Sequence, residues 1–305
     1  MKLIKRFFLL SLILTSSFLI CCSSSKKIFK GTAANDTQSP VRTLGTYAGL
    51  PRLDNGRADI SRLISQLNDL NVNTYNWLIW QGENDWDDLK LFLPLAKKHN
   101  IAVWVTLVPP TESKPKARWN SEPYGLDYIK WSEEVAKLSL TYPNLIALSI
   151  DDFVHNLDFY TPDYVGKMID EIDKINPNLN FIPCAYYSKI TQDFANKYGT
   201  LIDALLFPYR ASSDKRKNLQ NSRLVGNEIA HIRSLFKEEI PIYIDVYLTA
   251  HSSLGSSTPL YVEEVIKEAG KHADGILIYT HPNPSKDPEK YKIVKEEFLL
   301  LKSKK

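Results

Sequence analysis

Short apolar runs alternate with amphipathic stretches along most of this 305-residue chain, and this alternation limits the folds that it can adopt. The apolar runs predict strands at 43–47, 72–78, 101–107, 145–151, 180–183, 204–207, 241–245 and 275–279. The amphipathic stretches predict helices at 60–70, 86–99, 128–140, 162–175, 190–198, 219–236, 262–272 and 288–301. Strands that alternate with helices in this way form parallel βα units. Eight such units over about 260 residues predict an α/β fold, a single-domain (β/α)₈ TIM barrel.

Local signals in the helices and after the first strand agree with this prediction. Apolar residues recur at three- and four-residue spacing in the first helix, at Ile60, Leu63, Ile64, Leu67 and Leu70. Thr161 and Asp287 each stand before a proline, which suits the first turn of a helix. An open doubly wound sheet is the alternative, but no glycine-rich phosphate loop follows the first strand.

The first 40 residues differ in composition from the rest of the chain. Residues 1–21 combine a basic start with an apolar run from Phe7 to Ile20, as a secretory signal does. The run ends in Leu-Ile-Cys-Cys before a Ser-rich stretch, so it looks like a bacterial lipoprotein signal peptide with Cys22 as the lipidated residue. An ordinary signal peptide or an uncleaved anchor is the alternative. Residues 22–40 predict a flexible tether, and 41–305 the barrel domain.

These segments predict where the protein resides and which partners it meets. A lipid on Cys22 makes it a bacterial membrane-anchored lipoprotein, with the barrel exposed to the periplasm or the cell surface. Cys184 is then the only cysteine of the mature domain, so no internal disulfide is expected. The net charge of +3 is small and the chain has no basic stripe, so nucleic acid is not an expected partner.

The fourth predicted strand ends in two adjacent carboxylates, Asp151 and Asp152. Neighbouring carboxylates push their pKa values apart, so that one can stay protonated while the other is charged. An aspartate pair in a turn or at a helix N-cap is the alternative interpretation. Side chains alternate along a strand, which turns Ala147, Ser149 and Asp151 into the barrel. Active sites of such barrels lie at the carboxyl ends of the strands, so this position favours a catalytic pair.

Polar and aromatic residues occur on or after other predicted strands. Alternation also turns Trp104 on the third strand and Asp245 on the seventh into the barrel. Carboxylates among aromatic rings suit carbohydrate, because the rings stack on sugars and the carboxylates protonate a leaving oxygen. The predicted substrate-binding residues are Tyr47, Asn76, Trp80, Trp104, Tyr186, Arg210, Asp245 and Tyr279.

The spacing of the aspartate pair narrows the expected mechanism. The usual barrel glycosidase has a glutamate after strand four and another after strand seven, and this chain has neither. Adjacent carboxylates do not easily flank a sugar from opposite sides. They suit substrate-assisted hydrolysis, in which the 2-acetamido oxygen of the sugar is the nucleophile. One aspartate then orients the acetamide, and its neighbour is the general acid and later the general base.

A family resemblance rests on the same residues. The segment Ile150-Asp-Asp-Phe-Val-His-Asn156 resembles the Asp-Asp-Ile-Asp-His-Asn signature of the O-GlcNAcase and bacterial hyaluronidase-like β-N-acetylglucosaminidases. Three further segments are similar to that family's Asn-Thr-Tyr, Pro-Thr-Glu-Tyr and Trp-Asp motifs: Asn73-Thr74-Tyr75, Pro183-Cys-Ala-Tyr186 and Ile244-Asp245. The resemblance implies that Asp151 positions the acetamide and that Asp152 is the acid/base. It also implies that Tyr186 contacts the oxazoline-forming group and that Asp245 holds sugar hydroxyls.

Other positions of that family differ in this chain. Ile79-Trp80 stands where the family has a lysine after strand two, and Val246 stands where it has an asparagine on strand seven. Phe207-Pro-Tyr-Arg210 replaces the family's Trp-Thr-Gly-Pro after strand six. The resemblance therefore implies a glycoside hydrolase acting on glycans, N-acetylated ones included, without fixing the sugar.

Two other functions fit parts of the sequence. A barrel that binds glycans without cleaving them is compatible with the differing sugar-binding positions. A metal-dependent hydrolase could use Asp151, Asp152, Asp245, His251 or His281, but short His-x-His or His-Glu-x-x-His spacings are missing. No metal and no other cofactor is therefore expected.

Overall fold

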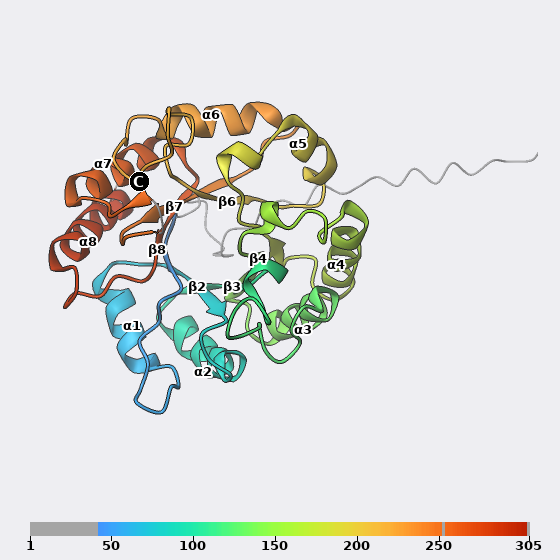
Figure 1. The fold of residues 1–305 in the computed structure, drawn as a ribbon. Helices are drawn as coiled ribbons and strands as arrows, with labels where there is room; N and C mark the ends of the chain where they lie inside the picture. The colour runs from blue at the N-terminus through green and yellow to red at the C-terminus, as the bar shows by residue number, and fades with distance from the viewer. Residues whose placement is uncertain (1–41, 252–253, 304–305) are drawn as a thin grey trace, which may run out of the picture.

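The computed structural model describes residues 42–251 and 254–303. Within these residues, eight parallel strands form one curled sheet and eight α-helices surround it (Figure 1). The strands are β1 (Thr43–Tyr47), β2 (Thr74–Ile79), β3 (Ala102–Leu107), β4 (Leu145–Ile150), β5 (Asn180–Phe181), β6 (Leu205–Pro208), β7 (Ile242–Tyr247) and β8 (Gly275–Tyr279). The helices are α1 (Ile60–Asp69), α2 (Asp85–Lys98), α3 (Tyr128–Thr141), α4 (Pro162–Ile175), α5 (Gln192–Tyr198), α6 (Val225–Leu235), α7 (Pro259–His272) and α8 (Pro288–Ser303).

The strand order β5-β4-β3-β2-β1-β8-β7-β6 leaves β5 and β6 at the two edges of the sheet. A bridge between Cys184 and Leu206 joins these edges. There the amide of Ala185 donates to the oxygen of Leu206 at 2.8 Å, and the amide of Leu206 donates to the oxygen of Pro183 at 3.1 Å. The sheet therefore closes on itself, and the predicted (β/α)₈ barrel is confirmed. The predicted signal peptide, Cys22 and the tether lie outside the described residues.

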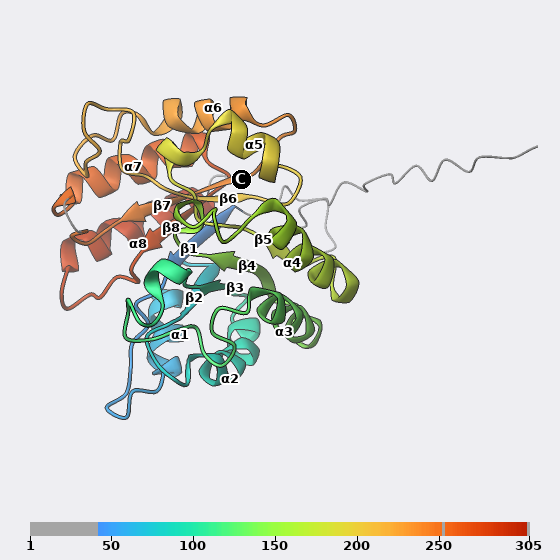
Figure 2. The ribbon, with the colours of Figure 1, turned by 45° about the vertical axis from the view of Figure 1, so that its right-hand side comes forward.

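The helices cover the outer face of the sheet, and the strands remain in the middle when the view is turned (Figure 2). In α1, Leu63, Ile64 and Leu67 are buried, as their spacing predicts. Burying one such side chain stabilises the fold by about 2 kcal/mol. At the start of α4, the hydroxyl of Thr161 accepts a hydrogen bond from the amide of Tyr164, and Pro162 begins the helix.

The barrel interior confirms the predicted alternation along the strands. Trp104 of β3 and Tyr243 of β7 meet edge to face across the barrel, with ring centroids 4.9 Å apart. The hydroxyl of Thr106 donates to Oδ1 of Asn76 at 2.6 Å, so β2 and β3 turn polar side chains inward together. A glycine is required on β8, because a Cβ at Gly275 would lie 2.7 Å from the Tyr243 ring.

Most elements differ from the predicted bounds by one or two residues, and helices α6 and α7 differ most. Helix α6 begins at Val225 rather than at 219, because Asn218 and Asn221 bond the amides of the residues that follow them and so favour turns. Helix α7 begins at Pro259, three residues earlier than predicted, since Thr258 caps it. Strand β5 ends at Phe181. None of the helices formed by the described residues has the length and apolarity that crossing a bilayer requires.

The loop between β1 and α1 is fixed by two carboxylates at the start of α2. Arg52 pairs with Asp85 at 2.7 Å, and Arg57 pairs with Asp88 at 2.5 Å. Oδ2 of Asp88 also accepts the buried amide of Ala58 at 2.8 Å. Asp88 is only 1% exposed, so its loss leaves buried donors without an acceptor.

We expect Asp88→Ala to lower the free energy of unfolding by about 2 kcal/mol, because the Ala58 amide stays buried without a partner. Urea denaturation followed by circular dichroism measures the change. The control is Asp87→Ala, since the side chain of Asp87 is 67% exposed and pairs only with Lys90. Equal stability of the two variants would contradict the role given to Asp88.

Candidate active site

The aspartate pair leaves the carboxyl end of β4 side by side. The amide of Asp151 donates to the oxygen of Leu107 at 2.9 Å, so pairing with β3 continues one residue past the strand. Asp152 has a left-handed backbone (φ +44°), and its amide donates to Oδ1 of Asp151 at 2.9 Å. Asp152 makes no side-chain bond that caps the following 3₁₀ turn, Phe153–His155. The helix-cap interpretation of the pair therefore does not hold.

Each aspartate receives a hydrogen bond from a tyrosine on a different strand. The hydroxyl of Tyr47, the last residue of β1, donates to Oδ2 of Asp151 at 2.6 Å. The hydroxyl of Tyr186, which follows β5, donates to Oδ1 of Asp152. These bonds hold both carboxylates in fixed orientations while leaving 23% of the Asp152 side chain exposed. The barrel thus presents two oriented carboxylates, and Asp152 is the one whose partial exposure is clear.

Cys184 is a neighbour of the pair that sequence reasoning did not assign to the site. Its thiol is buried and lies within 4.8 Å of a carboxylate oxygen of each aspartate. A hydrogen bond between this thiol and Asp151 lowers the pKa of the aspartate, while burial and the nearby carboxylates raise the pKa of the thiol itself. Cys184 therefore serves as a neutral hydrogen-bond donor to Asp151.

Burial and neighbouring charges shift the pKa of Asp151. Burial raises the pKa of Asp151 to about 6, and the charge of Asp152 adds to this rise. The hydrogen bond from Tyr47 acts in the opposite direction. Asp151 is therefore mostly ionised near neutral pH but gains a proton in mild acid.

Glu112 is a third carboxyl, and sequence reasoning missed it. It ends the 3₁₀ turn Pro110–Glu112 after β3, and its backbone oxygen accepts the indole N–H of Trp80 at 3.1 Å. Burial raises the pKa of Glu112 to about 8, with further contributions from Asp151 and then Asp152. Near neutral pH the region therefore holds a carboxylic acid within electrostatic range of a carboxylate, which is the division that acid–base catalysis needs. The only sequence signal was a glutamate in a proline-rich loop after a strand.

The β7 and β8 side of the barrel contributes one carboxyl and an aromatic group. Asp245 is buried, and its Oδ1 has no hydrogen-bond partner among the described residues. Burial raises its pKa well above the usual range, and Asp151 adds to the rise, so the two carboxyls lie within electrostatic range. The ring of Tyr279 lies 5.6 Å from that of Tyr47 and 4.9 Å from that of Tyr247.

Arg210 and His155 both contact Tyr186. The guanidinium of Arg210, which follows β6, lies 3.9 Å from the ring centroid of Tyr186. The ring of His155 stacks on Tyr186 with a centroid distance of 4.8 Å, and its Nδ1 is 3.6 Å from Oδ2 of Asp152. Tyr186 therefore links β4, β5 and β6 at the carboxyl end of the barrel.

The remaining predicted substrate-binding residues lie at different depths. Trp80 is partly buried and binds Glu112 as described above. Asn76 is fully buried, and its Nδ2 has no partner among the described residues. Trp104 is also fully buried and packs against Tyr243, so it occupies a core position inside the barrel rather than one that a sugar ring can reach.

The histidines considered as metal ligands are not gathered with the acidic residues. His281 bonds Oγ1 of Thr46 at 2.9 Å through Nδ1 and Oε1 of Gln66 at 3.1 Å through Nε2. Burial lowers its pKa to about 4. His251 packs against Tyr247 and Tyr279 instead. The imidazoles therefore have structural surroundings of their own.

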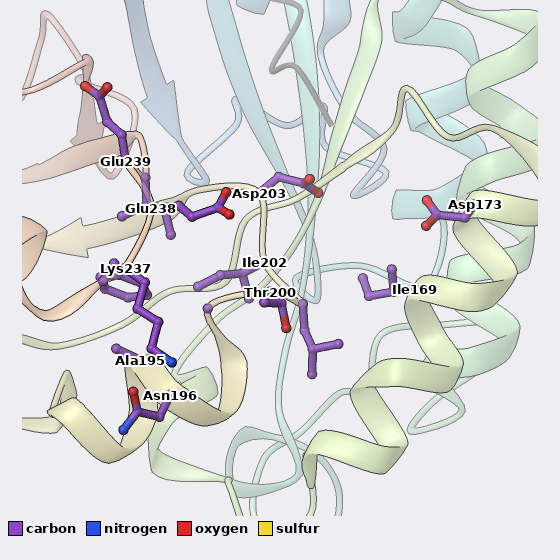
Figure 3. A pocket seen from close by; sticks show the side chains of 14 residues that line it. Ile169, Asp173, Ala195, Asn196, Thr200, Ile202, Asp203, Lys237, Glu238 and Glu239 are labelled. Atoms are coloured by element: carbon purple, nitrogen blue, oxygen red, sulfur yellow. The ribbon is translucent and has the colours of Figure 1, made fainter. Parts of the chain in front are cut away.

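A separate cavity of about 310 Å³ lies at the other end of the barrel (Figure 3). Its lining comes from residues that precede β6 and β7, including Ile202, Asp203, Glu238 and Ile240. One carboxylate there already accepts a backbone amide, since Oδ2 of Asp203 bonds the amide of Phe181 at 2.8 Å. Barrel active sites lie at the opposite, carboxyl end, so this cavity is not the candidate site.

No protein-family profile and no curated protein matches the chain. Solved structures are similar to it in fold. A GH18 chitinase from Pseudoalteromonas aurantia has a TM-score of 0.55 at 13% identity, with 84% of this chain and 99% of that chain covered. A GH113 β-1,4-mannanase has a TM-score of 0.60 at 10% identity, with 85% and 98% covered. Active domain 2 of a chitinase from Pyrococcus furiosus has a TM-score of 0.55 at 12% identity, with 87% and 97% covered. These three proteins are glycoside hydrolases, and at such low identities the likeness shows the (β/α)₈ fold.

Proposed function

We propose that this protein is a glycoside hydrolase that acts on glycans, N-acetylated ones included. The single observation that carries the proposal is the pair Asp151 and Asp152, side by side at the carboxyl end of β4 and each oriented by a tyrosine. Orientation of this kind makes carboxylates effective in acid–base catalysis. The fold that the chain shares with chitinases and a mannanase supports a glycan substrate.

In the proposed mechanism the acetamide of the sugar supplies the nucleophile. Asp151, ionised near neutral pH, accepts the acetamide N–H and directs its oxygen to the anomeric carbon. Asp152 is the proposed acid and base: in the substrate complex it must carry a proton, which it gives to the leaving oxygen, and it later removes a proton from the attacking water. Two displacements at one carbon retain its configuration. The partial exposure of Asp152 suits a group that must meet both the leaving oxygen and water.

Asp245 and the tyrosines around it would hold the sugar ring. The unpartnered Oδ1 of Asp245 can accept a hydroxyl, which would satisfy a buried acceptor. Tyr279 is partly exposed and offers a ring face for stacking. The resemblance to O-GlcNAcase-like enzymes gives Asp151, Asp152 and Asp245 these same roles, and it gives Tyr186 contact with the oxazoline-forming group. Because Arg210 and Val246 replace residues of that family, we leave the identity of the sugar open.

We expect Asp152→Asn to lower the rate of aryl glycoside hydrolysis by about 10²- to 10⁴-fold, because the carboxamide cannot transfer the proton. Release of 4-nitrophenol from a panel of aryl glycosides, N-acetylglucosaminide included, measures the rate. Asp158→Asn is the matched control, since Asp158 is exposed and nearby in sequence. EDTA should leave the rate unchanged. Activity that survives Asp152→Asn would exclude the acid/base role, and glycan binding without any hydrolysis would favour the non-catalytic barrel.

We expect kcat/KM to rise with pH around 6 and to fall around 8. The rise follows the ionisation of Asp151, whose pKa is about 6, because only its charged form accepts the acetamide N–H. The fall follows the ionisation of Glu112, whose pKa is about 8, because a further negative charge then faces the aspartates. Glu112→Gln should remove the alkaline limb, whereas Glu122→Gln in the same loop should keep it. If Glu112→Gln abolishes activity at every pH, Glu112 is the proton donor and Asp152 is not.

The membrane anchor is a separate part of the proposal, because Cys22 lies outside the described residues. The lipoprotein-like sequence before Cys22 supports lipidation of this residue. We expect the protein to incorporate labelled palmitate in a bacterial host and to sediment with membranes. Cys22→Ser should lose both properties, and Cys184→Ser, which changes the buried cysteine, should keep them. Label that persists in Cys22→Ser would exclude this anchor.

A further inference from the structure

Arg210 carries a positive charge into the site without a partner for it. The residue is only 8% exposed, and its guanidinium lies over the Tyr186 ring at 3.9 Å. Its Nε is buried and has no hydrogen-bond partner among the described residues. An aromatic face attracts a guanidinium but uses none of its N–H groups. The donors of Arg210 therefore remain available.

Three other partly buried arginines pair with carboxylates. Arg52 and Arg57 pair with Asp85 and Asp88, and Arg233 pairs with Asp274 at 2.6 Å. Within residues 42–251 and 254–303, no carboxylate lies within 4.0 Å of the Arg210 guanidinium. A buried charge without a counter-charge is costly, so such a charge is retained where a ligand supplies the opposite one.

Arg210 is not among the leading causes of the pKa shifts of Asp151 and Asp245. The groups that shift the pKa of Asp151 are Asp152, Tyr47 and Cys184, apart from burial, and none of them is basic. For Asp245 they are burial and Asp151. Burial raises the pKa of Tyr247, and the positive charge of Arg210 opposes this rise. Burial lowers the pKa of His251, and the charge of Arg210 adds to this fall. The cation thus lies on the β6–β7 side of the site.

The contacts of Tyr186 set the position of this charge relative to the proposed chemistry. One end of Tyr186, its hydroxyl, bonds Asp152, while its ring face carries the guanidinium. The backbone of Tyr209, which precedes Arg210, is also fixed, since its amide donates to the oxygen of Asp245 at 3.0 Å. The Tyr186 side chain therefore lies between Arg210 and the proposed acid/base residue, Asp152. One or two sugar rings can span this separation.

Given the proposed function, on which this step rests, we infer that the substrate is a glycan containing a uronic acid, whose carboxylate Arg210 binds. A guanidinium presents Nε–H and one Nη–H side by side, and a planar carboxylate accepts both in a bidentate pair. The buried and unpartnered Nε suits this side-on arrangement. A single negative charge also matches the single positive charge of Arg210.

Pairs of aryl glycosides that differ only at C6 test the inference on the full chain. We expect the aryl 2-acetamido-2-deoxyglucuronide to have a kcat/KM about 10-fold or more above that of the matching aryl N-acetylglucosaminide, because both sugars keep the acetamide that the proposed mechanism uses. Arg210→Gln should lower kcat/KM for the acidic member more than for the neutral member, and Arg210→Lys should keep part of the preference. Arg223→Gln, an exposed arginine in the same loop, should keep all of it.

A binding measurement separates this inference from the proposed function. Calorimetry with the Asp152→Asn protein would compare uronate-containing oligosaccharides, neutral ones of equal length and sulfated ones. Tighter binding of the uronates that Arg210→Gln abolishes supports the inference even if no aryl glycoside is hydrolysed. Equal loss of acidic and neutral substrates in Arg210→Gln overturns it while the hydrolase remains. Stronger binding of the sulfated ligands, or no binding of the uronates, also overturns it.

Discussion

Repulsion between two adjacent carboxylates is the constraint on which the candidate site depends. Asp151 and Asp152 leave β4 together, and only the groups around them make that proximity tolerable. Tyr47 from β1 and Tyr186 after β5 each donate a hydroxyl, and Cys184 adds a thiol. These donors come from strands that are far apart in sequence, so the pair can be held only when the whole barrel is formed. Fold and site are in this sense one structure.

The site divides into two electrostatic parts. Asp151, Asp152 and Glu112 share one region, where burial and mutual repulsion keep one carboxyl protonated near neutral pH. Arg210 occupies the other, over the ring face of Tyr186. The Tyr186 ring lies between Asp152 and Arg210 and keeps them from forming a direct ion pair. Such a pair would occupy both the carboxylate and the guanidinium. In the proposed function, this separation leaves the carboxyls available for proton transfer and the guanidinium available for a ligand.

Most of the fold could be predicted from the sequence because apolar periodicity reports which face of each element is buried. Strands β1 and β8 and helix α4 have the predicted bounds, whereas α6 begins late because Asn218 and Asn221 form turns through their side chains. The expectation that active-site residues lie at the carboxyl ends of barrel strands located Asp151, Asp152 and Asp245. It could not find Glu112, which lies in a loop, or Cys184, whose role depends on a neighbour across the barrel. It also placed Trp104 with the substrate-binding residues, since strand alternation shows that a side chain points inward but not at what depth.

The closure of the barrel has a consequence for the site. Only a short stretch of pairing around Cys184 and Leu206 joins the two edges of the sheet, and the same cysteine is hydrogen-bonded to Asp151. The short pairing that closes the barrel therefore lies beside the acidic pair. Local opening of this bridge would expose Asp151 to more water and relieve part of the desolvation that raises its pKa. Motion of the barrel wall would therefore change the proton affinity of Asp151.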